Sequence, residues 1–470
     1  MISIYDVLKA NKGLPVRDPI AYHWGRMLRA GEKKVIYGIR IDPDTADPYN
    51  RVTYLEDAVG MTPASMGATA FDYGSWAEAF FMPRPCMLKY DGAVDYYLDP
   101  NDFSKKLDGT ASDYNNLTYG GNVMLEFPKI YFKYVPNESG RDGEFYVSNH
   151  KVDDTYECWC NYDADNNEID HFYMAAYNGC CYDGKMRSIS GLTLAPYVTT
   201  TYSASATYAV GDKVNYQSKM YECITAVETA EAFDPAKWRQ YAFNGNTTGT
   251  EEMAYARANS TTAKDEWLIN LWADAILIWG LLMLMGKTTA LQETFGRGID
   301  SGSQAAAEAY VTGSLNDKGL FYGDTVNGNT AVKVFGVENF WGCKWRRCAG
   351  LFGTSTGYAY KLTHGTKDGS TASSFGMSAA GYLAVTAEQP ASNYVKNMML
   401  GRHGLIAGDT GSPASASAYY CDYFYGGAGF ALFGGSSYYG RICGICVTLA
   451  TSVRYRLWDF AAALSCKPLA

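Results

Sequence analysis

Alternation of hydrophobic and polar residues predicts strands at two places in the first third of the chain. Residues 34–42 alternate before a turn-rich segment at 42–48, and residues 123–134 form a second run of the same type. Alternation of this kind buries one face of a strand and leaves the other face to solvent. We therefore expect a strand in each segment.

Helical patterns are rare, and residues 263–285 carry the best example. Charged residues open this segment, and apolar side chains then recur at helical spacing. Its longest apolar run, residues 275–286, is shorter than the roughly 20 residues that cross a bilayer, so it predicts a buried helix. Beyond residue 286, short strand-like pieces alternate with glycine turns. Together these elements predict an α+β fold.

Residues 200–243 differ in character from their surroundings, and their flanks are polar and turn-rich, as is typical of an inserted domain. Tyr208, residues 210–214, residues 220–223 and residues 233–238 resemble the small three-stranded carbohydrate-binding modules of chitinases and phage tail proteins. The resemblance implies a small all-β insert.

The candidate sugar-binding residues of this insert are Tyr208, Tyr221 and Trp238. Aromatic rings bind sugars through their apolar faces, while neighbouring polar groups take the hydroxyls. The alternative is that all three rings build the core of the small module, a role that suits Trp238 best. The sequence leaves both interpretations open.

Composition narrows the range of functions. Charged residues make up 19% of the chain, below the usual figure of about 25%, whereas Gly (48) and Tyr (39) are abundant. Tyr and Gly enrichment is typical of adaptable binding surfaces. The net charge of −9 argues against nucleic-acid binding, which needs a basic surface.

The N-terminal residues lack a basic region followed by an apolar core, so we expect no signal peptide. Synthesis in a reducing bacterial cytoplasm would leave the 12 cysteines as free thiols. No segment is long and apolar enough to predict membrane insertion.

Six tyrosines fall between Gly404 and Gly440, a segment with two acidic and no basic residues. Two adjacent tyrosines, as at 419–420 and 438–439, cannot both face inward on a strand. At least half of the six should therefore be exposed. Such rings suit recognition better than catalysis, because each offers a large contact area and a hydroxyl group.

Residues 434–440 and 457–469 resemble the C-terminal block of phage tail-tip receptor-binding proteins, which have a C-type lectin-like fold and are often diversified by retroelements. Residues 335–342 are similar to a strand-turn that this fold shares with formylglycine-generating enzymes. The resemblance covers residues 119–470 apart from the insert. It implies a C-type lectin-like C-terminal domain with a variable display region at residues 404–466.

Carried onto this chain, the resemblance implies a rigid scaffold formed by Gly434, Gly435, Gly440, Gly444, Trp458 and Leu464. It implies ligand-binding side chains at Tyr423, Tyr425, Ser436, Ser437, Tyr438, Tyr439, Arg441, Ile442, Arg454, Tyr455, Arg456 and Asp459. Tyr, Trp and Arg dominate binding hot spots, which agrees with this assignment. The alternative for residues 454–456 is an ordinary charged turn.

Residues 37–42 and 57–62 resemble N-terminal regions of phage tail proteins. The resemblance implies that residues 1–118 form a tail-attachment or assembly domain. A homotrimer is one such assembly, although no residue fixes the number of subunits.

We expect no catalytic residue, no metal and no cofactor. The five histidines are scattered, and none forms a metal-spaced pair with another histidine or a cysteine. Cys443 and Cys446 have thiol–disulfide spacing but lie in no βαβ context, so redox activity is not expected.

The sequence therefore predicts a non-enzymatic adhesin of the virion, a phage tail fibre protein whose partners are a bacterial surface receptor and other tail proteins. The receptor can be protein or glycan. A first alternative is a surface adhesin of the bacterium itself. A second is an enzyme of the formylglycine-generating or glycan-degrading type.

Overall fold

The computed structural model describes residues 33–264, 266–444 and 447–469. Strands account for 33% of the structure and helices for 10%. The strands of the described residues are distributed over eight sheets. The expected α+β class, with a C-type lectin-like C-terminal domain, is therefore wrong, and the fold is β-rich.

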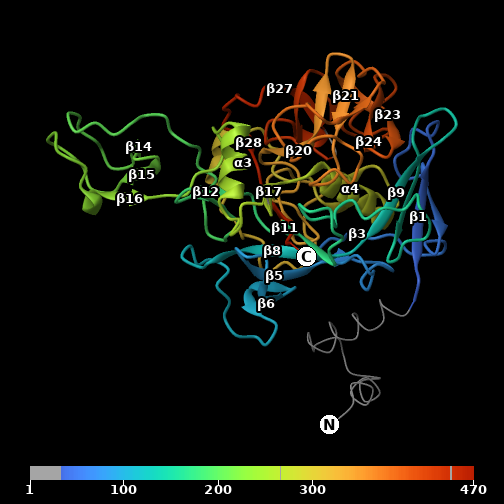
Figure 1. The fold of residues 1–470 in the computed structure, drawn as a ribbon, viewed down its shortest axis with the longest axis horizontal. Coiled ribbons are helices and arrows are strands. Elements are labelled where there is room, and N and C mark those ends of the chain that lie inside the picture. The colour runs from blue at the N-terminus through green and yellow to red at the C-terminus, as the bar shows by residue number, and fades with distance from the viewer. Residues whose placement is uncertain (1–32, 265, 445–446, 470) are drawn as a thin grey trace, which may run out of the picture.

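The largest sheet joins distant parts of the chain (Figure 1). Its seven strands are, in spatial order, β17 (Trp267–Ile269), β29 (Leu464–Cys466), β11 (His171–Ala175), β8 (Gly121–Pro128), β5 (Arg84–Lys89), β6 (Val94–Asp99) and β7 (Asp102–Lys106). The C-terminal strand β29 thus lies between two strands from the first two thirds of the chain.

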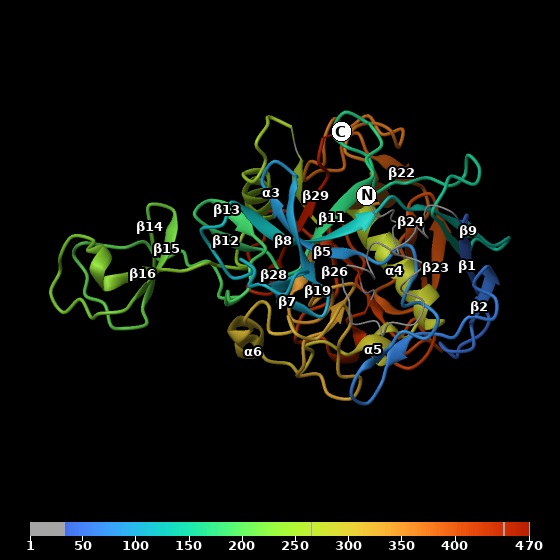
Figure 2. The same cartoon turned by 90° about the horizontal axis from the view of Figure 1, so that it is seen from below.

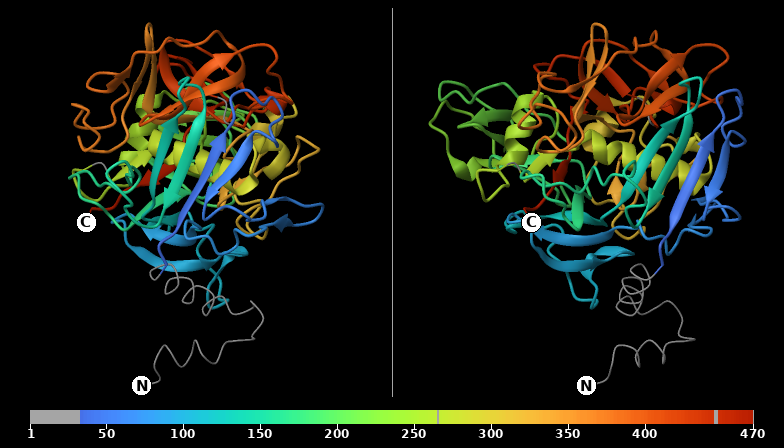
Figure 3. Two further views of the ribbon diagram at one scale, coloured as in Figure 1. Left: turned by 90° about the vertical axis from the view of Figure 1, so that its right-hand side faces the viewer. Right: turned by 45° about the vertical axis from the view of Figure 1, so that its right-hand side comes forward.

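A four-stranded sheet lies at one side of the molecule (Figure 3). Its strands are β2 (Val52–Glu56), β1 (Ile36–Ile41), β10 (Gly143–Ser148) and β9 (Tyr131–Pro136). β1 confirms the strand expected at residues 34–42, whereas the run at 123–134 divides between β8 and β9.

The expected boundary at residue 118 does not separate two folding units. β1 pairs with β10 from Ile36↔Ser148 to Ile41↔Gly143, and β5 pairs with β8. Residues before 118 therefore share sheets with residues after it. Residues 1–32 of the proposed attachment domain lie outside the described residues.

Helix α4 (Trp272–Gly286) lies at the centre of the molecule, and 14 of its 15 residues are buried. This confirms the buried helix expected at residues 275–286. The longer helix expected at 263–285 is wrong at its start, because residues 267–269 form β17. A short apolar run fits a buried strand and a buried helix equally well, so periodicity could not separate the two. No helix in the described residues is long and apolar enough to cross a membrane.

Side chains from three directions hold α4. Tyr134 on β9 donates a hydrogen bond to the Ile276 carbonyl (2.7 Å), and Lys467 forms a buried ion pair with Asp274 (2.6 Å). The indole nitrogen of Trp272 donates to the His403 carbonyl (2.7 Å), at the turn between two later strands.

The C-terminal half covers the other side of α4 with two sheets. The larger contains β22 (Leu383–Val385), β21 (Gly357–Tyr360), β20 (Trp345–Thr354), β26 (Gly429–Phe433) and β27 (Val447–Thr451), with β28 (Phe460–Ala461) parallel to β20. The smaller contains β24 (Gly404–Thr410), β23 (Asn393–Gly401) and β25 (Tyr423–Phe424).

The remaining elements are short. The two-stranded sheets are β3 (Ser65–Met66) with β4 (Phe71–Asp72), β12 (Cys180–Tyr182) with β13 (Lys185–Arg187), and β18 (Lys333–Val334) with β19 (Val337–Glu338). The other helices are α3 (Gly249–Arg257), α5 (Leu291–Phe295), α6 (Gln304–Ala309), η1 (Pro235–Lys237) and η2 (Gly440–Ile442).

The insert forms a separate three-stranded sheet that projects from the body of the molecule (Figure 2). Its strands are β14 (Lys213–Tyr216), β15 (Lys219–Cys223) and β16 (Trp238–Gln240). At its base, Met220 packs with Cys181 and Phe243 in a small buried cluster. The insert is thus joined to the body at one end only.

His403 gives the fold a defined sensitivity to acid. Burial lowers the pKa of its imidazole from 6.5 to about 4. As the pH falls through 6.5, the unfolded chain binds a proton that the folded chain cannot accept, so stability is lost between pH 6.5 and 4. A shift of this size corresponds to about 3 kcal/mol.

We expect the His403→Phe variant to lack this loss. The ring contact with Tyr360 is kept by an aromatic replacement, and the buried Nδ1 has no hydrogen-bond partner in the described structure. Urea unfolding of both proteins at pH 7 and pH 4.5 measures the difference. Equal pH dependence in the two proteins would contradict a buried, neutral imidazole.

Candidate ligand-binding face

Four buried or half-buried tyrosines and one tryptophan form a continuous row of rings on the C-terminal half. Tyr439 contacts Trp345 (centroids 5.0 Å apart) and Tyr425 (5.5 Å). Tyr425 contacts Tyr423 (4.6 Å), which in turn contacts Tyr394 (5.3 Å). We call Tyr394, Tyr423, Tyr425 and Tyr439 the tyrosine ridge. Each ridge ring is half-buried, so one part packs and another part is available for contact.

The second part of the face is the turn at residues 452–458, which lies between β27 and β28. Arg454, Tyr455 and Arg456 are exposed, Tyr455 to 55%. Trp458 at the end of the turn contacts Tyr438, which is also 55% exposed, with ring centroids 5.3 Å apart. This contact joins the turn to the segment that follows β26.

The turn is anchored to helix α3 through Arg347. The Arg347 guanidinium donates to the Tyr455 carbonyl (2.8 Å) and forms an ion pair with Glu252 (2.7 Å). The side chains of Arg347 and Glu252 are both buried. Arg456 pairs with Glu251 on the same helix (2.5 Å). The backbone of the turn is therefore fixed, which leaves the side chains of Arg454 and Tyr455 to point outward.

Three of the expected ligand-binding residues are buried. Ser436 and Ser437 are fully enclosed, and Asp459 is 9% exposed. The chain turns back at Gly434 and Gly435 (φ 85° and 64°), and this brings Ser437 into hydrogen bonds with residues 302–303 and 343. These three residues support the face and do not display side chains on it.

Arg441 and Ile442 lie in η2 at the edge of the face. Arg441 is exposed and pairs with Glu293, and Ile442 is half-buried. Of the expected scaffold, Leu464 is buried in β29, and a side chain at Gly444 would collide with the Asp422 carboxylate. Cys446, which has thiol–disulfide spacing with Cys443, lies outside the described residues.

A groove of about 730 Å³ opens beside the tyrosine ridge. Three loops line it, namely residues 354–357 between β20 and β21, residues 386–392 after β22, and residues 426–428 after β25. Sequence reasoning missed this groove. The only available signal was the clustering of Ser, Thr and Gly in three segments that only the fold brings together.

Gln389 holds the three loops of the groove in place. Its side-chain nitrogen shares its two N–H groups among the carbonyls of Thr354 (3.2 Å), Gly357 (2.8 Å) and Gly427 (3.0 Å). Its side-chain oxygen accepts a hydrogen bond from the Gly427 amide (2.8 Å). The groove is therefore preformed.

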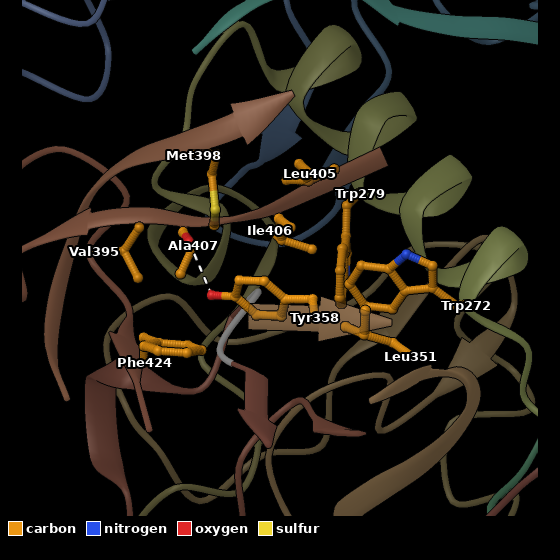
Figure 4. Close-up of a pocket in the computed structure, with 10 residues that line it drawn as sticks. All are labelled: Trp272, Trp279, Leu351, Tyr358, Val395, Met398, Leu405, Ile406, Ala407 and Phe424. Carbon is orange, nitrogen blue, oxygen red and sulfur yellow. Dashed lines mark hydrogen bonds between the residues drawn. The ribbon is translucent and has the colours of Figure 1, made fainter. Parts of the chain in front are cut away.

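Two other hollows differ from this groove in size and lining. A void of about 10 Å³ lies between α4 and β20–β24, and it is lined by apolar groups such as Trp279, Leu351 and Phe424 (Figure 4). A space of this size barely holds one water, so it is a packing void. A groove of about 580 Å³ lies beside Trp159, with Lys133 and Arg402 among its lining residues.

In the insert, the three expected sugar-binding rings lie in its small core or pack against it. Trp238 is 4% exposed and contacts Tyr208 (5.1 Å), and Tyr221 contacts Phe233 (4.9 Å). Tyr208 and Tyr221 are half-buried. The core alternative therefore describes Trp238, whereas Tyr208 and Tyr221 pack against the core with part of each side chain still exposed.

The described part of the chain does not contain a metal-ligating cluster or an exposed cysteine. It contains no cluster of three or more metal-ligating side chains. Its 11 cysteines are free and buried, and burial raises the pKa of the Cys343 and Cys421 thiols to about 12. A thiol of this kind is a poor nucleophile at neutral pH.

Comparison with known proteins adds no assignment: no family model matches the chain, and no curated protein matches it either.

The Arg347–Glu252 pair supports the face, and its removal should be costly. Arg347→Met leaves the Glu252 carboxylate buried without its partner, and we expect a loss of about 3–5 kcal/mol in unfolding free energy. The double variant Arg347→Met/Glu252→Gln should lose less than the two single variants combined. Additive losses in urea unfolding would contradict a coupled pair.

The buried and exposed positions after β26 should respond differently to substitution. Gly435→Ala requires a Cβ 2.4 Å from the Cys443 sulfur at φ 64°, so we expect a clear fall in melting temperature. Tyr438→Ala removes an exposed ring and should change unfolding free energy by about 0.5 kcal/mol or less. Thermal unfolding of both variants measures this contrast, and equal effects would contradict the described turn.

Proposed function

We propose that the protein is a non-enzymatic receptor-binding protein of a phage tail, which recognises a bacterial surface ligand through its C-terminal face. The face comprises the tyrosine ridge, the groove beside it, and the exposed side chains Tyr438, Arg454 and Tyr455. The virion is its proposed place of action, and other tail proteins are its proposed partners.

The observation that carries this proposal is the concentration of Tyr, Trp and Arg side chains on a preformed surface. Tyr and Trp provide contact area at low cost in side-chain entropy, and Arg adds charge-assisted hydrogen bonds. The turn at 452–458 is fixed by Arg347, and the groove is fixed by Gln389. A preorganised surface loses little entropy on binding, which favours affinity.

The distribution of buried and exposed positions also supports a display role. In residues 434–444 an outward stretch at 438–442, which includes Tyr438 and Arg441, lies between buried residues such as Ser436 and Cys443. Outward side chains can change without altering the core, so this segment can acquire new specificity at little cost in stability.

Removal of the outward aromatic side chains should weaken cell binding. We expect the double variant Tyr438→Ala/Tyr455→Ala of the full chain to bind bacterial cells at least tenfold more weakly, because such rings contribute about 2 kcal/mol or more at hot spots. Flow cytometry of labelled protein on a panel of bacterial strains measures this change.

Val59→Ala is the matched control, because Val59 is an exposed apolar residue on the turn after β2. It should bind as the unaltered protein does. Equal binding by the double variant, or binding by the unaltered protein to no strain in the panel, would contradict the proposed function.

A further inference from the structure

The groove beside the tyrosine ridge has the chemistry of a sugar-binding site. Its volume of about 730 Å³ lies within the range of roughly 300–1,000 Å³ that is typical of small-ligand sites. Hydroxyl side chains line it from two of its three loops: Thr354, Ser355 and Thr356 from one, and Thr386 and Ser392 from another. Hydroxyl groups donate and accept hydrogen bonds, as the hydroxyls of a sugar do.

The charge of the groove further limits the class of ligand that it can bind. Among the described residues that line it, Glu388 alone carries a charged side chain, and this side chain is exposed. A carboxylate disfavours an acidic ligand at short range, since like charges repel. It accepts hydrogen bonds from hydroxyl or amide groups and pairs with an ammonium group.

One ring of the tyrosine ridge is linked to a loop of the groove. The Tyr423 hydroxyl donates to the carbonyl of Ser392 (3.1 Å), and the Ser392 side chain accepts a hydrogen bond from the Gly426 amide (3.0 Å). Tyr423 is half-buried and continues into the ridge through Tyr394. The ring of Tyr423 is not among the described residues that line the groove, but it lies next to Ser392, so a ligand that extends out of the groove would meet hydroxyl groups first and then ring edges. A pyranose presents hydroxyls and C–H groups, which suit both kinds of contact.

We infer that this groove binds a pyranose unit without an acidic group, either a neutral sugar or an amino sugar, in a glycan of the bacterial surface. The inference rests on the proposed function, since it names the ligand class of the same face. Glu388 disfavours acidic sugars, Gln389 holds the loops, and the tyrosine ridge contacts the next unit of the glycan.

Filling the groove should abolish glycan binding. Thr386→Trp places a large ring in the groove at an exposed position, so the fold should remain intact. The control is Thr53→Trp, the same change at an exposed position of β2 in another sheet. Both full-length variants and the unaltered protein are applied to an array of neutral, amino and acidic oligosaccharides, and also to cells of a strain that binds the unaltered protein.

The unaltered protein and Thr53→Trp should bind neutral or amino oligosaccharides, and Thr386→Trp should bind them at least tenfold more weakly. Glu388→Gln should increase binding to acidic oligosaccharides. Glycan binding that survives Thr386→Trp would place the sugar elsewhere, for instance on the insert, and would overturn the inference.

Two further outcomes separate the inference from the function on which it rests. Cell binding that persists in Thr386→Trp, without array binding by the unaltered protein, would indicate a protein receptor and would overturn the inference alone. Absence of cell binding by the unaltered protein would overturn the proposed function.

Discussion

Buried backbone carbonyls need hydrogen-bond donors, and in this protein buried lysines and arginines supply many of them. The need arises because the described strands are divided among eight sheets, which leaves irregular connections between them. Lys344 donates to the carbonyls of Leu194 (2.7 Å) and Asn244 (2.8 Å). Arg346 donates to the carbonyls of Glu338 (2.6 Å) and Asn339 (2.9 Å). Burial lowers the pKa of Lys344 to about 8 and that of Arg346 to about 9, which shows how strongly these charges are enclosed.

Residues 344–347 supply hydrogen-bond donors to buried carbonyls and also support the candidate binding face. Lys344 reaches the base of the insert, Arg346 reaches the turn at 338–339, and Arg347 holds the turn at 452–458. Trp345, between them, packs beneath the tyrosine ridge. One short segment thus fixes the insert, the ridge and the outward turn relative to one another. A surface held from within in this way can vary its outer side chains while the fold stays the same.

Local patterns in the sequence predicted local structure well. Alternation at 34–42 predicted β1, the apolar run at 275–286 predicted α4, and turn-rich flanks marked an insert that has its own sheet. Such local patterns could not predict which distant strands pair. For example, β17 and β29 are neighbours in one sheet although nearly 200 residues separate them in the sequence. The predicted fold class was wrong for this reason. Strands that pair over such distances are short and leave weak patterns in the sequence, whereas the one buried helix left a strong pattern.

For the candidate site, composition identified the right kind of residue but not always the right position. Tyr438, Arg454 and Tyr455 are exposed as expected, whereas Ser436 and Ser437 are enclosed because Gly434 and Gly435 turn the chain inward. The groove is formed by three loops that are separated along the chain, so no single motif marks it.

The most direct test of recognition by the C-terminal face is hydrogen exchange of the full chain with and without fragments of a bacterial envelope that it binds. Protection should concentrate in residues 386–392, 423–428 and 452–458. Protection confined to the groove beside Trp159 or to the four-stranded sheet would contradict recognition by the C-terminal face.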